Sequence, residues 1–453
     1  MTSEFRGDFS RDSFDPHKHF SRVLMQQGRV QLDADWNEQA AILLHYMRTL
    51  ALDLMGSHAG NGFKIKPVID DNGNITDLTI GTGHYYVDGI LCENEKKYDQ
   101  EGKEILLSYY EQEDYPIEKK ILPALPFLVY LDVWERHISY IEDDSIREVA
   151  LNGIDTATRG KIIWQVRTSE KLKSATSCNE IEPTWEALVQ EWQPQNRGML
   201  RAKVEKKASD DTNACIINPE SRYRGAENQL YRVEIHTGGT KEQGATFKWS
   251  RENSSIAFRC LKQNGNQLTL NMSARDSTFG ISSGQWVELT NDNNELLGKP
   301  GTIVKVAKIE GNILTIDHYT AKGSINLTKN LHNLKVRRWD YQDKKDTKSK
   351  NLDKLLLLAE DNALSIIEGT DEENWLTLED GIKIQFQPGA TYRTGDYWLI
   401  PARTATGNIL WKQNPDGKPK ALPPHGIEHH YAPLALIIGV DNYSSCRREI
   451  RSI

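Results

Sequence analysis

The segment from residue 14 to residue 56 constrains the fold of this chain most strongly, because it joins a short extended arm to one long helix. Two short segments, residues 23–25 and 30–32, flank a Gln-Gln-Gly-Arg kink and are expected to be extended. Asp35, followed three residues later by Glu38, is predicted to cap the helix in a capping box, and Gly56 is predicted to end it. Apolar residues recur at helical spacing in between, namely Trp36, Ala40, Leu43, Leu44, Met47, Leu50 and Leu54.

This segment carries no pattern of catalytic residues. A long apolar stripe near a chain end is typical of an element that docks onto another chain. We therefore predict an attachment or oligomerisation interface here. The predicted interface residues are Val23, Leu24, Met25, Arg29, Val30, Leu32, Trp36, Leu43, Leu44, Met47 and Leu50.

The composition indicates a soluble globular protein of two to four domains, because 453 residues exceed what one hydrophobic core usually organises. The formal net charge is −8, and no long basic tract is present, which argues against a nucleic-acid-binding face. Eleven Trp and seventeen Tyr supply the large rings that build β cores and protein interfaces.

The cysteines and the first residues bear on the cellular compartment. Five cysteines stand far apart with no CxxC pair, so we expect reduced, mostly buried thiols rather than a metal ribbon. The first twelve residues are polar and charged, unlike a signal peptide. No stretch approaches the ~20 apolar residues that span a bilayer, so we expect synthesis in the cytosol and no direct membrane insertion.

After residue 60, short alternating stretches between Gly turns predict a mainly β fold of several small antiparallel modules. Residues 63–69 and 75–80 are predicted to form a hairpin. Residues 127–134 are apolar on both faces and are predicted to form a central strand, with 161–167 as a neighbour. Five strands between residues 256 and 317 are predicted to form a small barrel.

These patterns divide the chain into four predicted parts. They are an N-terminal arm and helix (1–60), a β-rich body (61–254), a small barrel-like module (255–340) and a C-terminal β module (355–453). Residues 340–354 are highly charged and are predicted to form a solvent-facing linker.

One cluster of possible metal ligands lies near the C-terminus. His425, His429 and His430 fall within six residues and are candidate ligands for zinc, iron or nickel. Prolines flank the cluster, and the sequence indicates no fourth ligand or second shell, so a surface or turn role is the competing interpretation.

Other motifs are explained without catalysis. The GxSxG match at 280–284 is followed by a β-like run rather than a helix, so it is interpreted as a turn. The acids at 142–144 are interpreted as a solvated surface, and residues 291–295 as a polar hairpin tip. The sequence has no phosphate loop, dinucleotide fingerprint or HExxH motif, and no cofactor is predicted.

Residues 7–39, GDFSRDSFDPHKHFSRVLMQQGRVQLDADWNEQ, resemble the start of an uncharacterised family encoded in gene clusters for phage-tail-like contractile injection systems. Residues 223–235, 245–252, 395–403 and 424–433 are similar to the same family, so the resemblance covers nearly the whole chain. The N-terminal theme is also similar to segments of phage tail-fibre and baseplate-attached proteins. The family has no established activity, so no catalytic residue is carried over.

The resemblance implies a non-enzymatic structural protein, a fibre or adaptor at the baseplate or tail of such a particle. Its expected partners are other particle proteins and further copies of the same chain, for which a trimer is the usual arrangement in fibres. We expect assembly on the particle and release from the cell with it. The alternatives are a glycan- or receptor-binding module of the particle and a delivered cargo or envelope-degrading hydrolase.

Overall fold

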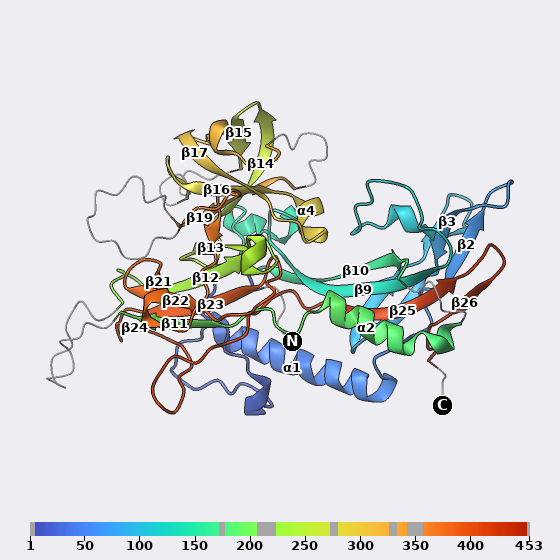
Figure 1. Ribbon diagram of the computed structural model, residues 1–453, viewed down its shortest axis with the longest axis horizontal. Coiled ribbons are helices and arrows are strands. Elements are labelled where there is room, and N and C mark those ends of the chain that lie inside the picture. Colours follow the sequence, from blue (N-terminus) through green and yellow to red (C-terminus); the bar gives the residue numbers. More distant parts are fainter. Residues whose placement is uncertain are drawn as a thin grey trace.

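The computed structural model describes residues 5–171, 177–205, 223–271, 280–325, 333–341 and 357–450 of the chain. The fold is mainly β, as the sequence predicts, and is built from antiparallel sheets with few helices. Figure 1 shows the small barrel at the top, a long sheet reaching toward a second lobe, and α1 along the opposite side. Within these ranges the α-helices are α1 (Asp33–Met55), α2 (Glu182–Trp192) and α4 (Asp292–Leu296).

The long sheet has the strand order β10-β9-β25-β26. Its members are β9 (Phe127–Ile138), β10 (Arg159–Ser169), β25 (His430–Ile437) and β26 (Tyr443–Ser445). The prediction of a central strand at 127–134 is confirmed, because β9 pairs with β10 on one side and β25 on the other. Leu128 and Tyr130 pack under α2, whereas Phe127 and Val129 face the opposite core.

Three small sheets make up the second lobe, and the two three-stranded ones cover that opposite face of β9. The predicted hairpin is confirmed, because β2 pairs antiparallel with β3 around the turn at residues 70–74. The strands are β1 (His58–Gly60), β4 (Gly83–Val87) and β5 (Ile90–Asn94); β2 (Ile65–Ile69), β3 (Ile75–Ile80) and β8 (Leu107–Ser108); and β6 (Lys97–Tyr98) with β7 (Glu104–Ile105).

The body contains a five-stranded and a three-stranded sheet that share one large core. The first is β20 (Leu364–Ser365), β13 (Thr246–Ser250), β12 (Gln229–Ile235), β23 (Tyr397–Arg403) and β24 (Asn408–Ile409); the second is β11 (Leu200–Val204), β22 (Ile382–Phe386) and β21 (Leu376–Thr377). β12 pairs with β23, β11 with β22 and β9 with β25. These sheets therefore combine strands from the predicted 61–254 and 355–453 parts.

The small barrel is closed, in the order β14-β15-β18-β17-β16-β19. Its strands are β14 (Ala257–Asn264), β15 (Gln267–Leu270), β16 (Trp286–Thr290), β17 (Thr302–Glu310), β18 (Ile313–Asp317) and β19 (Lys335–Trp339). Alternating apolar residues such as Val287, Val304 and Val336 fill its interior, which explains why period-2 patterning predicted the barrel. The charged stretch from residue 342 onward lies outside the described residues up to 356.

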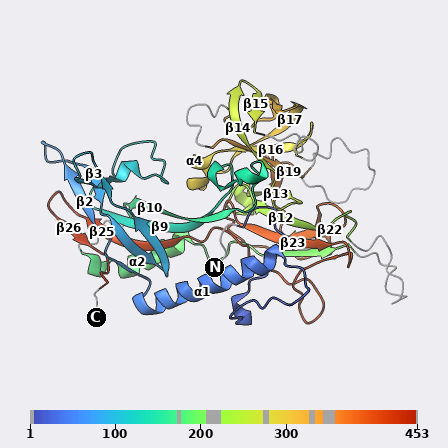
Figure 2. The ribbon, with the colours of Figure 1, turned by 180° about the vertical axis from the view of Figure 1, so that it is seen from behind.

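Seen from behind, α1 runs beneath both the body and the second lobe (Figure 2). Among the described residues, no helix is long and apolar enough to cross a membrane. Short 3₁₀ turns occur at Pro16–Lys18, Tyr109–Glu111, Asp144–Ile146, Val149–Leu151, Cys178–Glu180, Lys241–Gln243, His318–Thr320 and Glu372–Asn374.

Candidate functional site: an exposed apolar surface and a buried ionic junction

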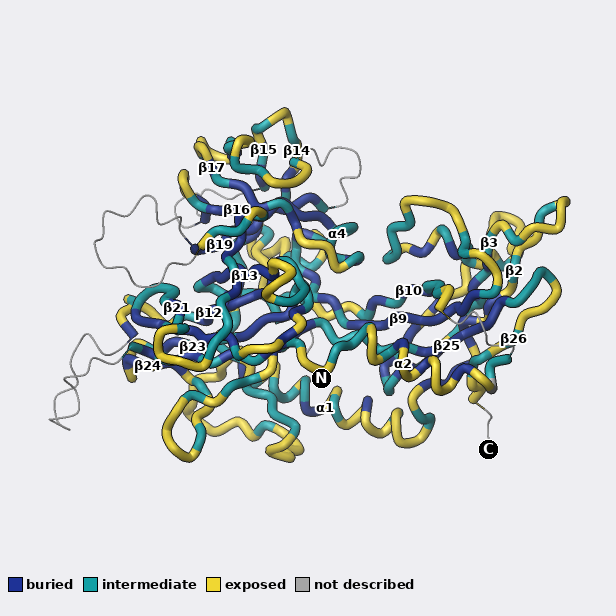
Figure 3. The backbone as a smooth tube through the Cα atoms, in the orientation of Figure 1, coloured by how far each residue is buried: buried dark blue, intermediate teal, exposed yellow. Residues whose placement is uncertain are grey.

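The predicted interface residues lie on the outside of the molecule, on the arm and on α1. Nine of them are exposed apolar side chains, from 38% for Leu44 to 84% for Val30. Arg29 is also exposed, and Val23 is half-buried. We call this the arm-and-helix surface; its apolar members are Leu24, Met25, Val30, Leu32, Trp36, Leu43, Leu44, Met47 and Leu50. Figure 3 shows exposed backbone along the arm and along much of α1.

The start of α1 differs from the predicted capping box. The helix begins at Asp33, so the N-cap residue is Leu32 and Asp35 is the third helical residue. The Asp35 carboxylate accepts the Leu32 N–H at 3.3 Å, while Glu38 accepts from the Ser13 hydroxyl at 2.6 Å. Acidic residues in the first turn are favoured by the helix dipole, which explains an earlier start at Asp33. The predicted end at Gly56 is confirmed, with φ +78° and its N–H bonded to Leu52 O.

Hydrogen bonds tie the arm to the body and to α1. The Phe5 carbonyl accepts from Arg232 and Asn253, at 3.0 Å each. Farther along, the Val23 N–H donates to Gln39 Oε1 at 2.8 Å, which aligns the extended piece with the helix. The apolar side chains of the arm are thus presented by polar contacts of its backbone.

A buried ionic junction joins the long sheet, α4 and the barrel. We define it as Arg136, Glu142, Asp292, Glu295 and Lys335. Arg136 Nη2 lies 2.6 Å from Asp292 and 2.7 Å from Glu295. Lys335 Nζ, from the barrel strand β19, bonds Glu142 and lies 2.9 Å from Glu295.

The charges of the ionic junction are fixed by their neighbours. Burial alone would raise the pKa of Glu142, but the Lys335 ammonium outweighs it and lowers that pKa to about 2. The Lys335 ammonium and the Arg136 guanidinium likewise outweigh burial and lower the pKa of Glu295 well below its usual range. A general acid needs a raised pKa, so these carboxylates do not suit that role.

Two sequence interpretations are corrected here. Glu142 was expected on a solvated surface, but it is half-buried and bonded to a fully buried lysine. Residues 291–295 were expected to be a hairpin tip, but Asn291 caps α4, which presents Asp292 and Glu295 to the ionic junction. Asp292 pairs with Arg136 of β9, 156 positions away, and Glu142 pairs with Lys335 of β19, 193 positions away. Local sequence patterns could not reveal partners at such separations.

Metal binding is limited by the same geometry. Among the described residues, Glu142, Asp292 and Glu295 form the one group of three ligand-type side chains close enough to share an ion. The two buried cations already pair with these carboxylates and offset their negative charge, which weakens the attraction of the group for a metal ion.

The three candidate histidines do not form such a group. His429 Nδ1 lies 2.7 Å from Asp132, and His430 Nδ1 lies 2.8 Å from Asp88. His425 is held by backbone pairing with Tyr397, and burial, aided by the nearby Arg232, lowers its pKa to about 4. Each of the three histidines therefore has a contact partner within the subunit, and metal binding by the cluster stays a prediction.

The GxSxG match is a turn, as predicted, followed directly by β16. Ser282, the serine of the match, donates its backbone N–H to Gln285 Oε1 at 2.7 Å and accepts the Gln285 N–H at its carbonyl at 3.3 Å, which are ordinary turn contacts. A nucleophile elbow would need a helix after the serine.

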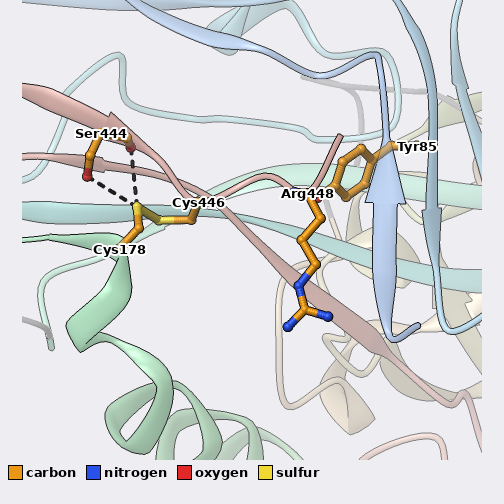
Figure 4. The surroundings of a disulfide bond; sticks show 5 residues. All are labelled: Tyr85, Cys178, Ser444, Cys446 and Arg448. Carbon is orange, nitrogen blue, oxygen red and sulfur yellow. Dashed lines mark hydrogen bonds between the residues drawn. A yellow bond between two sulfur atoms is a disulfide. The ribbon is translucent and has the colours of Figure 1, made fainter. Parts of the chain in front are cut away.

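The expectation of reduced thiols is wrong for one pair. Cys178, just before α2, forms a disulfide with Cys446, which follows β26 (Figure 4). The Ser444 hydroxyl lies 3.2 Å from Cys178 Sγ. The two cysteines are 268 positions apart, and only the packing of α2 beside β26 brings them together, so their spacing gave no signal. Cys92 and Cys260 are free and buried, as expected, and Cys215 lies outside the described residues.

The fold and the site define a mainly β protein with a helix-bearing arm that exposes apolar side chains. The chain belongs to DUF6519, a family of unknown function, whose model matches residues 5–194 and 186–452. No curated protein and no solved structure matches it. The resemblance to an uncharacterised family is therefore confirmed, whereas the phage-tail context stays a prediction.

Proposed function

We propose that this chain is a non-enzymatic structural component of a phage-tail-like contractile injection system, a fibre or adaptor at the baseplate or tail periphery. It attaches through the arm-and-helix surface. Its partners are other particle proteins and copies of itself, and it reaches the outside of the cell with the particle. The resemblance of residues 7–39 to tail-associated proteins supports this context.

The observation that carries the proposal is the exposure of nine apolar side chains on one arm and one helix. Monomeric proteins rarely expose large contiguous apolar patches, because each buried Å² of apolar surface is worth about 25 cal/mol. Such a patch therefore favours association.

The buried ionic junction supports a scaffold role for the remainder. Its charges come from β9, α4 and β19, so correct pairing requires one arrangement of the long sheet and the barrel. Breaking a buried pair is costly, which resists rotation of these parts. An adaptor that transmits force between particle proteins needs a rigid body behind the segment that attaches it.

The test is assembly in the producing cell. Intact particles are purified from cells that make the wild-type chain or a Leu24→Glu/Val30→Glu variant, and sheath, tube and this chain are quantified by mass spectrometry. We expect the wild type to co-purify in fixed ratio and the variant to be lost from particles while remaining folded. Val149→Glu, at an equally exposed site away from the arm, is the matched control. Absence of the wild-type chain from purified particles would refute the proposal.

Glycan binding is a second candidate, favoured by a cavity of about 470 Å³ beside α2. Its lining mixes the rings of Trp185 and Tyr431 with the planar polar groups of Gln193, Arg393 and Glu428, a combination that suits stacking and hydrogen bonding to sugars. A glycan array probed with the wild type and with Gln193→Ala/Glu428→Ala tests it. Binding that the double variant loses would support this candidate, and no binding by the wild type would reject it.

A further inference from the structure

Six residues of α1 follow a strict heptad rather than a general amphipathic pattern. The steps between them alternate four, three, four, three and four residues, which is a 3.5-residue repeat. All six are exposed. We call them the heptad seam; they are Trp36, Ala40, Leu43, Met47, Leu50 and Leu54.

The opposite side of α1 is the one that its own subunit covers. Ala34, Ile42 and Arg48 are the buried residues of the helix. With the seam at heptad positions a and d, these three occupy b and c, which lie about 180° away at 100° per residue. Arg48 donates to Glu135 of β9 at 2.7 Å, and a Cβ at Gly89 would strike the Arg48 carbonyl, so the helix sits tightly on the long sheet and the second lobe.

The arm contacts the same covered side and its flank, and leaves the seam open. Ser13 bonds Glu38, the Val23 N–H bonds Gln39, and Phe14 packs near His45 with ring centres 5.8 Å apart. Glu38 and His45 are f positions and Gln39 is a g position. The rest of the subunit, the arm included, thus accounts for b, c, f and part of g, whereas a, d and e face outward.

Residues beside the seam permit pairing between identical helices. The e and g residues are Asn37, Leu44, Ala51, Gln39, Tyr46 and Asp53, of which one is charged. Charges at e and g normally select partners, and like charges there would keep copies apart. Their near absence removes this repulsion, and exposed Leu44 and Tyr46 widen the apolar contact.

We propose that α1 pairs along the heptad seam with α1 of other copies of this chain, forming a homo-oligomeric coiled coil with the bodies outside it. This inference rests on the proposed function, and it identifies a second copy of the chain as one partner of the arm-and-helix surface. A helix of 23 residues spans roughly 35 Å, and it is already formed on the body, so association pays little of the nucleation cost that a free peptide pays.

A second copy fits the seam better than an unrelated particle protein. Knobs-into-holes packing requires a partner helix with the same 3.5-residue repeat, and an identical α1 supplies it in register. Because the body sits opposite the seam, copies can bring their helices to a common axis. The arm residues near Leu24 and Val30 then remain available for attachment to the particle.

Sedimentation velocity of the purified full chain tests the pairing without the particle. Between 1 and 100 μM we expect the wild type to sediment as a multiple of 51.6 kDa. Met47→Glu/Leu50→Glu places charges in the seam and should raise the dissociation constant by at least ~100-fold. Circular dichroism should remain unchanged, because both side chains are exposed in the subunit.

Two control variants separate this inference from the proposed function. Leu52→Glu, at an f position, and Leu24→Glu/Val30→Glu, on the arm, should keep the oligomer. A wild type that is monomeric at 100 μM, or seam variants that associate like the wild type, would overturn the coiled coil even if the chain co-purifies with particles. Loss of co-purification with an intact oligomer would instead reject the attachment role alone.

Cysteine crosslinking tests whether the heptad seams of two copies face each other. In a Cys215→Ser background, Met47→Cys places one thiol per copy at an a position, and mild oxidation should link two chains rapidly. Leu52→Cys, facing away from the seam, should remain uncrosslinked. Equal crosslinking of both variants would contradict the seam.

Discussion

The heptad seam and the ionic junction place opposite kinds of side chain where each is least expected. The seam exposes Leu, Met and Trp side chains on α1, whereas the junction buries Lys335 and Arg136 and holds three half-buried carboxylates between sheet and barrel. In the junction every charge has its partner within the same subunit, so that region is complete. In the seam no partner is supplied by the described residues of the subunit, so that region is completed only by association.

The difference teaches where stability and function reside in this fold. A buried charge pair resists disruption because removing one partner strands the other in a low-dielectric environment. An exposed apolar side chain contributes little to the folding of its own subunit and much to association. The junction should therefore control the free energy of unfolding, and the seam should control assembly.

The largest expected effect follows from breaking the junction. Lys335→Met removes the cation that bonds Glu142 and Glu295, and we expect the free energy of unfolding to fall by about 3–5 kcal/mol. Urea denaturation measures it. Lys308→Met, which removes an exposed lysine paired with Glu310, is the matched control and should change stability by less than about 0.5 kcal/mol. Equal effects of the two substitutions would erase the contrast between interior and surface.

The disulfide should give the next largest effect. Cys178→Ser/Cys446→Ser frees the α2 end from β26, and we expect a loss of about 2–4 kcal/mol, because the crosslink limits the unfolded chain. Thermal denaturation with and without dithiothreitol measures it. The reductant should destabilise the wild type and leave the double variant unchanged; a wild type indifferent to reductant would contradict the expectation.

The pH dependence sharpens the interior side of the comparison. Burial lowers the pKa of His58 to about 4, so the unfolded chain takes up a proton at higher pH than the folded chain does. The stabilisation from this histidine is complete above pH 6.5 and is lost as the pH falls from 6.5 to about 4, a loss on the order of 3 kcal/mol. Urea denaturation across this range should show a shallower decline for His58→Gln than for the wild type, while His84→Gln, at an exposed site, should follow the wild type.

The carboxylates add a second window at lower pH. The Lys248 ammonium outweighs burial and lowers the pKa of Glu288 to about 2, as Lys335 does for Glu142. Stability from these acids is present above about pH 4.5 and is lost as the pH falls toward 2. A stability curve flat from pH 4.5 to 2.5 would show that these pairs do not hold the fold.

The smallest effect on folding is expected at the seam. Met47→Glu changes a side chain that is 69% exposed, so the free energy of unfolding of the monomer should move by less than about 0.5 kcal/mol. Urea denaturation in a Leu50→Glu background, in which the seam charge keeps the chains monomeric, measures it, with Ile42→Glu on the buried side of α1 as the contrasting variant. A loss at Met47 as large as that at Ile42 would mean that the seam packs within its own subunit.

Much of the fold was predictable because its signals are local. The hairpin at β2 and β3 and the barrel strands β14 to β18 show local alternation, and the central strand β9 shows a short run that is apolar on both faces. The sixth barrel strand, β19, was not predicted. The helix α1 was predictable from its spacing, but its start was placed three residues late, because two acidic residues compete for the first turn. The apolar residues of α1 in the arm-and-helix surface could also be predicted from sequence, because they recur at helical spacing.

The sequence by itself determined the strands, the long helix and the apolar stripe that the helix carries, since each depends on residues a few positions apart. Only the tertiary structure decided which chain segments share a sheet, that Lys335 meets Glu142, and that Cys178 meets Cys446. It also decided that α1 turns Ile42 inward and Met47 outward. These outcomes depend on contacts between segments far apart in the chain, and the energy of such contacts is set by geometry that no single stretch of sequence contains.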